Sequence, residues 1–159
     1  MSLPAPALAL VLFGVVLLVV AFARHAADGP TPGVVRASPA LTPGVLNPDV
    51  TQANIAETIC RQGWTATIRP PTDFTQRLKL EQMRTYGLSG SPADYEEDHL
   101  VSLELGGHPT DPRNLWPEPI KRALDVDGTE NDLNRRVCDG SLSLADAQRK
   151  IAEVKHEDG

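Results

Sequence analysis

Aromatic residues and cysteines are scarce in this sequence. Phe, Tyr and Trp make up 4% of the 159 residues, and cysteine occurs twice. The chain has no G-x-S-x-G motif and no phosphate-binding P-loop, so nothing points to serine-hydrolase or nucleotide-binding chemistry. It also has no C-x-x-C pair, and two cysteines do not form a zinc site on their own.

The chain also lacks a basic excess. It has 15 Lys and Arg residues against 21 Asp and Glu residues, which gives a formal net charge of −6. Proteins that bind nucleic acid without sequence preference typically carry a positive excess, so this class is disfavoured. The composition excludes collagen, a coiled coil and a polytopic membrane protein, and no internal repeat is present. The length accommodates about one domain.

One long apolar run is present, at residues 7–23. We assign residues 1–23 to a signal peptide or a single transmembrane anchor. Ala21-Phe22-Ala23 matches the small-x-small pattern of a cleavage site. However, no Lys or Arg precedes the run, and residues 3–23 form about 31 Å of helix, enough to span a bilayer. Both alternatives stay open, and we expect a membrane-anchored or secreted, extracytoplasmic protein of a bacterial envelope.

Residues 24–48 contain five prolines and three glycines and lack apolar periodicity. This composition predicts a flexible linker. We therefore expect a folded domain at residues 49–155 and a short tail at 156–159. Cys60 and Cys138 both fall in this domain, and an even pair in a small exported domain favours one disulfide. The alternative is two buried free thiols in a cytosolic protein.

Local patterns predict a small α+β domain. Helix signals are a cap at Asp49 or Thr51, glycine stops, and apolar residues at helical spacing. Strand signals are alternation and β-forming residues. The expected helices are one ending near Cys60, one around 78–86, one within 120–137, and one opened by Ser143 with Asp146 in its first turn. The expected strands are 64–68, 95–105, and a short piece at 114–116 that is halted by Pro117 and Pro119.

The residues best suited to catalysis or metal binding lie in the second predicted strand and in the segment after it. Asp98 and His99 are adjacent, so on a regular strand their side chains point to opposite faces. At a strand end or a bulge both can approach one site. A carboxylate is a suitable ligand for Mg²⁺ or Mn²⁺, and an imidazole can act as a general base near neutral pH. Gly106-Gly107 predicts a turn that brings Asn114 back towards them.

The pattern Asp98-His99, Gly106-Gly107 and Asn114-Leu115 resembles the HNH endonuclease superfamily, also called ββα-metal or His-Me finger. More closely, about 100 residues resemble small exported bacterial proteins with an HNH-like core. The stretches that carry this resemblance read DHL…LELGG…DPRNLWPEP, TIC…GWT…RPP upstream, and a Val-Cys pair downstream. The resemblance implies a ββα-metal core with flanking helices.

The resemblance also implies roles for individual residues. Asp98 would bind a divalent metal, expected to be Mg²⁺, and His99 would be the general base that activates water. Asn114 would orient that base. The reaction implied is phosphodiester hydrolysis in DNA or RNA. The alternative is an inactive HNH-like scaffold that serves as an envelope-associated binding module.

The sequence departs from the family pattern at the third motif position. The expected helix position holds Arg122 and Ala123, and neither is a plausible ligand. Further on, four polar residues share one face if that segment is helical: Asp127, Glu130, Asn131 and Asn134. We assign Asn131 as the second metal ligand, with Asp127 as the alternative. An ordinary solvated helix face explains the same pattern.

Overall fold

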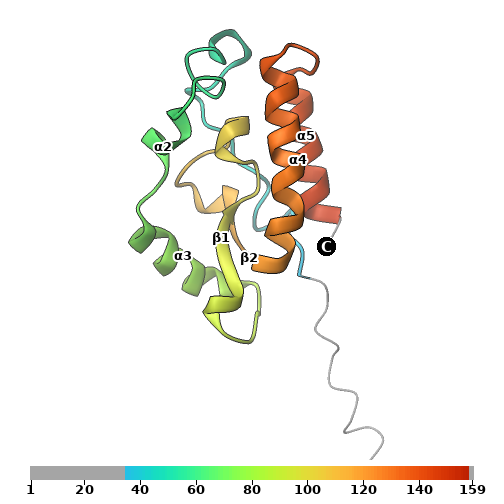
Figure 1. Cartoon of the computed structure of the whole chain (residues 1–159). Coiled ribbons are helices and arrows are strands. Elements are labelled where there is room, and N and C mark those ends of the chain that lie inside the picture. The colour runs from blue at the N-terminus through green and yellow to red at the C-terminus, as the bar shows by residue number, and fades with distance from the viewer. Residues whose placement is uncertain (1–34, 158–159) are drawn as a thin grey trace, which may run out of the picture. The chain divides into compact units, whose positions relative to one another are not determined.

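The computed structural model describes residues 35–157, which form a mixed α+β fold around one two-stranded antiparallel sheet (Figure 1). The predicted α+β class is confirmed. The principal elements are α2 (Trp64–Ile68), α3 (Thr72–Thr85), β1 (Tyr95–His99), β2 (Leu115–Pro119), α4 (Ile120–Cys138) and α5 (Leu144–Glu157). Short 3-10 turns lie between them, at η1 (Gln52–Asn54), η2 (Pro92–Asp94), η3 (Leu103–Leu105) and η4 (Pro112–Asn114).

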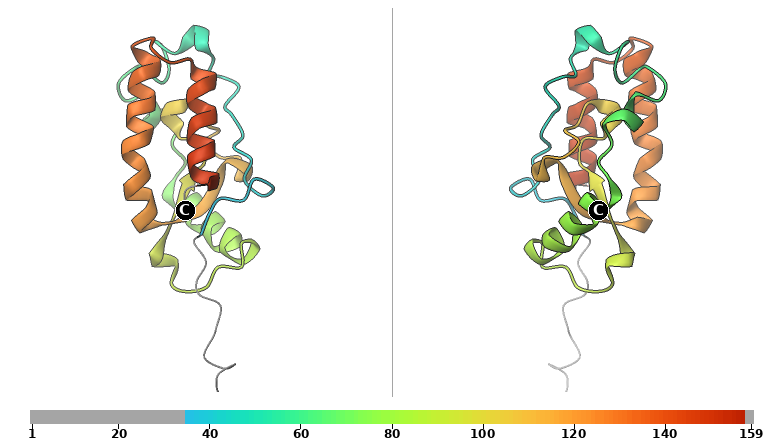
Figure 2. Two further views of the ribbon diagram at one scale, coloured as in Figure 1. Left: turned by 90° about the vertical axis from the view of Figure 1, so that its right-hand side faces the viewer. Right: turned by 90° about the vertical axis from the view of Figure 1, so that its left-hand side faces the viewer.

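The hairpin of β1 and β2 lies between α3 and the paired helices α4 and α5 (Figures 1 and 2). Its register pairs Asp98 with Trp116 and His99 with Leu115. Because side chains alternate along a strand, Asp98 and Trp116 share one face, and His99 and Leu115 share the other. The register therefore directs the side chains of Asp98 and His99, which are adjacent in the sequence, to opposite faces of the hairpin.

Strand β2 continues through two prolines that were predicted to halt it. Pro117 pairs with Glu97, and Pro119 pairs with Tyr95. In a two-stranded ladder, alternate residues turn their N–H groups away from the partner, so a proline at such a position costs no ladder hydrogen bond. The strand then passes directly into α4, with Pro119 as the residue before its first turn.

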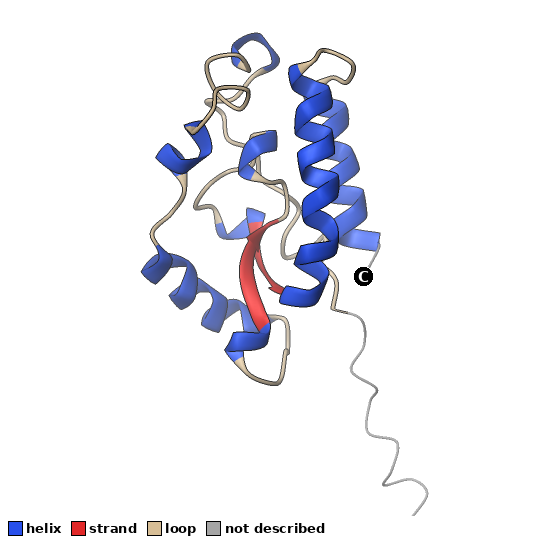
Figure 3. Cartoon of the chain, in the orientation of Figure 1, coloured by secondary structure: helices blue, strands red, loops and turns tan. Residues whose placement is uncertain are grey.

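Residues 64–68 form helix α2, and the predicted strand is wrong (Figure 3). Gly63, with φ of 80°, turns the chain immediately before the helix. Trp64 is buried, and Ile68, four residues later, packs against the same core. This spacing matches one face of a helix, and packing decides between the two structures because β-propensity depends strongly on context.

Two other predicted elements are shorter than expected. The helix expected to end near Cys60 is reduced to the turn η1, followed by further turns. The strand expected at 95–105 ends at His99, the last residue paired with β2. Beyond it, Leu100 and Val101 are both buried, so the chain enters the core and no longer follows the sheet.

The predictions for the last two helices are confirmed, and α3 begins six residues before Leu78. Ser143 caps α5, since its hydroxyl accepts a hydrogen bond from the Asp146 backbone N–H at 3.1 Å. The buried residues of α5 recur at helical spacing: Leu144, Ala147, Ile151 and Lys155. The last of these is a lysine, although the stripe faces the protein interior.

A disulfide joins Cys60 to Cys138, with Cα atoms 5.6 Å apart. It connects the turns after η1 to the end of α4. The main core lies beside it and consists largely of buried apolar residues from α2, η3, α4 and α5, including Trp64, Leu105, Leu133 and Ile151. Because the domain is small, this covalent link contributes a substantial share of its stability.

The segment 35–48 is packed on the domain, which corrects the predicted linker for these residues. Ala37, Thr42 and Asn47 are buried. The Gly44 N–H donates to the Arg113 carbonyl at 3.0 Å, and the Asn47 N–H donates to the Gly106 carbonyl at 2.9 Å. The predicted signal or anchor at 1–23 lies outside the described residues. Among residues 35–157, no helix has both the length and the apolarity of a membrane span.

Candidate functional site

The loop between β1 and β2 is held by the side chain of Asn114. Its amide oxygen accepts a hydrogen bond from the Val101 N–H at 3.0 Å, and its amide nitrogen donates to the Val101 carbonyl at 3.1 Å. The same nitrogen donates to the His108 carbonyl at 3.0 Å. Asn114 has no exposed surface. One buried amide therefore fixes both arms of the loop.

Gly107 permits this close arrangement. A Cβ atom at this position would lie 1.7 Å from the Val101 carbonyl oxygen and 2.7 Å from the Asn114 amide nitrogen. Only glycine fits there, because both neighbours are held by the Asn114 hydrogen bonds. Packing therefore requires glycine at the second position of the Gly106-Gly107 pair that the sequence analysis identified.

His99 lies at the end of β1, and its ring is fixed by the loop. Its Nε2 lies 3.0 Å from the Pro109 carbonyl oxygen. A carbonyl only accepts, so Nε2 carries the hydrogen. Burial lowers the pKa of His99, which is 6% exposed, so the ring is neutral near pH 7 and Nδ1 carries the free electron pair. Among the described residues, the hydrogen bonds of the Asn114 amide go to Val101 and His108 and none goes to the His99 ring, so Asn114 positions His99 through the loop backbone.

Asp98 faces the other way, towards α4 and α5, and binds the ammonium of Lys155. The Lys155 side chain is 1% exposed. It also donates to the His99 carbonyl at 2.8 Å and lies 2.6 Å from Oε1 of Glu130. The second oxygen of Glu118, on β2, is 3.8 Å from the same nitrogen. Carboxylates from β1, β2 and α4 thus converge on one lysine from α5.

The pKa values of these groups reflect their burial and their mutual charges. Burial raises the pKa of Glu118 to about 8 and that of Glu130 to about 7, and the neighbouring Asp98 carboxylate adds to both. Burial also opposes ionisation of Asp98, but the charge of Lys155 prevails and holds the pKa of Asp98 below its ordinary value. The cluster therefore keeps Asp98 ionised and Lys155 protonated.

Arg122 lies beside Glu118 on the β2 side of this cluster. Its guanidinium forms an ion pair with Glu118, donates to the Val154 carbonyl at 2.9 Å, and lies 5.5 Å from the centre of the Trp116 ring. This residue is one of the two at the helix position where the resemblance to the HNH pattern predicts a ligand. It is engaged in binding a buried carboxylate and an aromatic face.

Asn131 does not join Asp98. Its amide nitrogen donates to the Asp127 carbonyl of its own helix at 2.8 Å, on an exposed face. The α4 residue that shares a partner with Asp98 is the preceding residue, Glu130. The structure does not bring together Asp98 and Asn131, the two predicted metal ligands, because their side chains bind different partners.

The cluster around Asp98 does not fit a divalent metal. Within the described part of the chain, no three His, Cys, Asp or Glu side chains are arranged to hold a metal ion. The three carboxylates that do converge surround an ammonium, and a divalent cation cannot share that position with a charged lysine.

A polar cavity of about 180 Å³ lies beside this cluster. Its walls come from α2, the loop at η3 and α4, and its lining residues are Thr65, Arg69, Ser102, Leu103, Glu104, Glu130 and Asn131. The positive charge of Arg69 contributes to the low pKa of His99, so its guanidinium is within electrostatic reach of the imidazole. Among residues 35–157, no ion pair or side-chain hydrogen bond of Arg69 is found.

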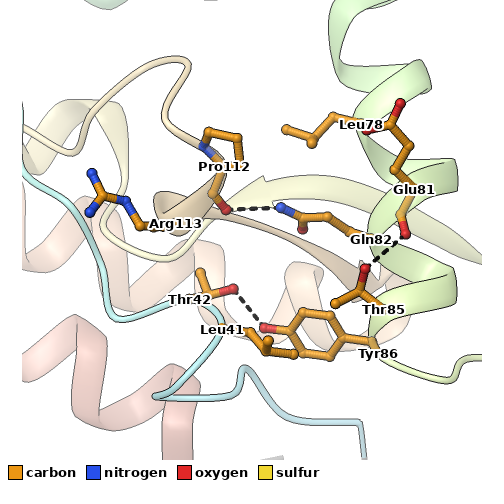
Figure 4. A pocket seen from close by; sticks show the side chains of 9 residues that line it. All are labelled: Leu41, Thr42, Leu78, Glu81, Gln82, Thr85, Tyr86, Pro112 and Arg113. Atoms are coloured by element: carbon orange, nitrogen blue, oxygen red, sulfur yellow. Dashed lines mark hydrogen bonds between the residues drawn. The ribbon is translucent and has the colours of Figure 1, made fainter.

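A second, more apolar cavity of about 280 Å³ lies between the segment around Leu41, α3 and η4 (Figure 4). Thr42 and Tyr86 share a hydrogen bond of 2.6 Å across it, and Gln82 donates to the Pro112 carbonyl at 2.8 Å. None of the residues that the sequence singled out as catalytic or metal-binding lines this cavity. It contains no imidazole or thiol, so we place the candidate site at the hairpin.

Sequence reasoning missed Lys155 and Glu118 as parts of the site, and it named Glu130 only as one member of a polar helix face. A signal for Lys155 was present, because it follows Leu144, Ala147 and Ile151 on the apolar stripe of α5. A lysine at such a position needs a buried partner. No protein-family model, curated protein or solved structure matches the chain. The site is therefore interpreted from its geometry.

Proposed function

We propose that residues 35–157 form an HNH-like nuclease domain that hydrolyses phosphodiester bonds in DNA or RNA, with His99 as the general base. The observation that carries this proposal is the hydrogen bond between His99 Nε2 and the Pro109 carbonyl at 3.0 Å. It fixes the tautomer of a neutral imidazole and leaves Nδ1 as the proton acceptor. Asn114 supports this role by holding the loop that carries Pro109.

In this reaction His99 takes a proton from the attacking water. The water oxygen forms a bond to phosphorus, the ester P–O bond breaks, and the proton then passes to the leaving oxygen. Arg69, in the polar cavity, supplies positive charge for the phosphate. The negative charges of Glu104 and Glu130 in the same cavity oppose phosphate binding, so Arg69 carries the recognition of the phosphate in this proposal.

The proposed location is outside the cytoplasm, either secreted or held at the membrane. The Cys60–Cys138 disulfide supports this, because such bonds form and persist in oxidising compartments. The apolar segment 7–23 would direct the export or anchor the chain, as the sequence predicts.

A second candidate function is an inactive HNH-like scaffold that acts as an envelope-associated binding module. Two observations favour it. The Asp98 carboxylate is engaged by Lys155, and His99 is almost entirely buried. In this alternative, both residues serve only to hold the hairpin against α5 and the loop. The two candidates differ in whether His99 is needed for a chemical step.

Cleavage assays on the full-length chain separate the two functions. Supercoiled plasmid and a single-stranded RNA are incubated with wild type and His99→Ala, each with EDTA and with Mg²⁺. We expect wild type to cleave at least one substrate and His99→Ala to lose most of that rate, of the order of 10²-fold or more. The matched control is His156→Gln, which removes another imidazole bonded to a backbone carbonyl, that of Thr42, away from the loop.

Equal cleavage by wild type and His99→Ala rejects His99 as the base. An absence of cleavage by all variants on both substrates, with circular dichroism showing that the proteins are folded, supports the scaffold function. Arg69→Ala, compared with the exposed Arg149→Ala, tests the phosphate contact: the nuclease proposal predicts a higher KM only for the first.

A further inference from the structure

The ammonium of Lys155 has the oxygen environment of a bound cation. It contacts the Asp98 carboxylate, lies 2.8 Å from the His99 carbonyl oxygen and lies 2.6 Å from Glu130 Oε1. These oxygens come from β1 and α4, and helix α5 carries the lysine. Divalent cations such as Ca²⁺ are held by carboxylate and backbone oxygens at about 2.3–2.6 Å. The lysine therefore fills a position whose donor set suits an inorganic cation.

Glu118 gives an independent indication that the position selects a cation. This residue has no exposed surface, and its Oε2 has no hydrogen-bond partner among the described residues. That oxygen lies 3.8 Å from the Lys155 nitrogen. A buried carboxylate oxygen without a donor is costly unless a positive charge lies near it. Glu118 therefore depends on the two cations beside it, because Lys155 lies near Oε2 and Arg122 forms an ion pair with Oε1.

From this convergence we propose that Lys155 is the resident cation of the Asp98–Glu118–Glu130 cluster and that it excludes divalent metal ions from it. Removal of the lysine side chain would leave the carboxyl groups of Asp98 and Glu130 and the His99 backbone carbonyl around the vacated volume, with Glu118 beside them, and hard cations take oxygen donors of this kind once the carboxyl groups shift to bind them. The proposal does not depend on nuclease activity. If the domain cleaves nucleic acid, the reaction uses no divalent cation bound to Asp98.

Metal binding by the full-length chain tests this directly, with Mn²⁺ as the probe. Isothermal titration compares wild type, Lys155→Ala and Lys155→Ala/Asp98→Asn, and Lys150→Ala is an exposed control on the same helix. We expect saturable binding by Lys155→Ala, at least about tenfold tighter than that by wild type or Lys150→Ala. The double variant should lose that gain, because it lacks the β1 carboxylate.

A second measurement keeps the test decisive if Lys155→Ala folds poorly. Thermal unfolding is recorded with and without about 5 mM Mn²⁺. Mn²⁺ should raise the Tm of Lys155→Ala, or restore a cooperative transition to it, and should do neither in the double variant. In the wild-type background, Asp98→Asn should leave the Mn²⁺ response unchanged. The proposal is overturned if Mn²⁺ binds wild type and Asp98→Asn removes that binding, or if Lys155→Ala responds to Mn²⁺ no more than wild type does.

Discussion

Lys155 of α5 and Asp98 of β1 are 57 residues apart in the sequence and form a hydrogen-bonded ion pair in the interior of the domain. This pair holds the last helix against the hairpin. It also turns Asp98 away from the loop that fixes His99, so adjacent residues of one strand serve two separate groups of contacts. The charge of the cluster and the orientation of the imidazole are thus fixed by different side-chain contacts, although Lys155 also donates to the His99 backbone carbonyl.

Loss of the lysine charge should strongly destabilise the domain. Lys155→Met keeps most of the apolar volume of the side chain but leaves Asp98 and Glu130 without their cation. Breaking a buried ion pair from one side typically costs about 3–5 kcal/mol. We expect urea unfolding at pH 7 to show a loss of this size for Lys155→Met and a change below about 0.5 kcal/mol for the exposed Lys150→Met.

The pH dependence of this loss has a definite sign. Lys155 holds the pKa of Asp98 below its ordinary value, so the stabilisation is present above the unfolded-state pKa, near 3.9, and is lost as the pH falls through the lower native value. The stability difference between wild type and Lys155→Met should therefore shrink as the pH is lowered from 6 to 3. A difference that grows over this range contradicts the ion-pair interpretation.

Two glycine substitutions should have opposite effects. Gly107→Ala places a methyl group against the Val101 carbonyl and the Asn114 amide, which cannot both be kept in place, so we expect a loss of roughly 2–4 kcal/mol. Gly128→Ala lies within α4, where a Cβ meets no atom within 4 Å. It should stabilise the helix by about 0.5–1 kcal/mol. Denaturant unfolding of both variants gives the comparison.

Comparison of Gly107→Ala with Gly128→Ala shows whether the Asn114 hydrogen bonds make the loop rigid. If Gly107→Ala is as stable as wild type, the Asn114 hydrogen bonds do not hold the loop rigidly. If the domain is an active nuclease, Gly107→Ala should also lower kcat, because the Pro109 carbonyl orients His99 from this loop. Gly128→Ala should leave kcat unchanged.

The disulfide should contribute several kcal/mol. The bond between Cys60 and Cys138 spans 78 residues, and closing a loop of this length is worth about 4 kcal/mol in the chain-entropy model. Cys60→Ser/Cys138→Ser should lose stability of this order in urea unfolding. Dithiothreitol should lower the Tm of wild type towards that of the double variant and should not affect the double variant. An equal response of the two proteins would show that the bond does not form in solution.

Local sequence signals located the hairpin residues but not their partners. The positions of Asp98, His99 and Asn114 around one turn follow from motif spacing and from Gly106-Gly107. The pairing of Asp98 with Lys155 does not, because no local pattern relates residues 57 positions apart. The apolar stripe of α5 was readable up to Ile151, and its continuation at Lys155 was the one available signal that a buried carboxylate lies opposite.

The errors in secondary structure have physical causes. Trp64–Ile68 has strand-like composition, yet Gly63 and the burial of Trp64 and Ile68 on one side produce a helix. Pro117 is a strand breaker only where its N–H would be needed, and in a two-stranded sheet half of the positions do not need it. In both cases tertiary context overrides a residue preference, which a single sequence does not reveal.

Glu97 should make the domain less stable as the pH rises. Neither of its carboxyl oxygens has a hydrogen-bond partner among the described residues, and burial, with the charge of Asp98, raises the pKa of Glu97 to about 8. Between about pH 4.5 and 8 the native state therefore keeps a proton that the unfolded chain has released, so stability falls over this range. The unfolding free energy of Glu97→Gln should match that of wild type at pH 5 and exceed it at pH 8 by on the order of 3 kcal/mol.

Urea unfolding at both pH values measures this difference. The control is the exposed Glu153→Gln, which should follow wild type at each pH. A constant difference between Glu97→Gln and wild type at the two pH values would mean that Glu97 titrates like an exposed carboxyl.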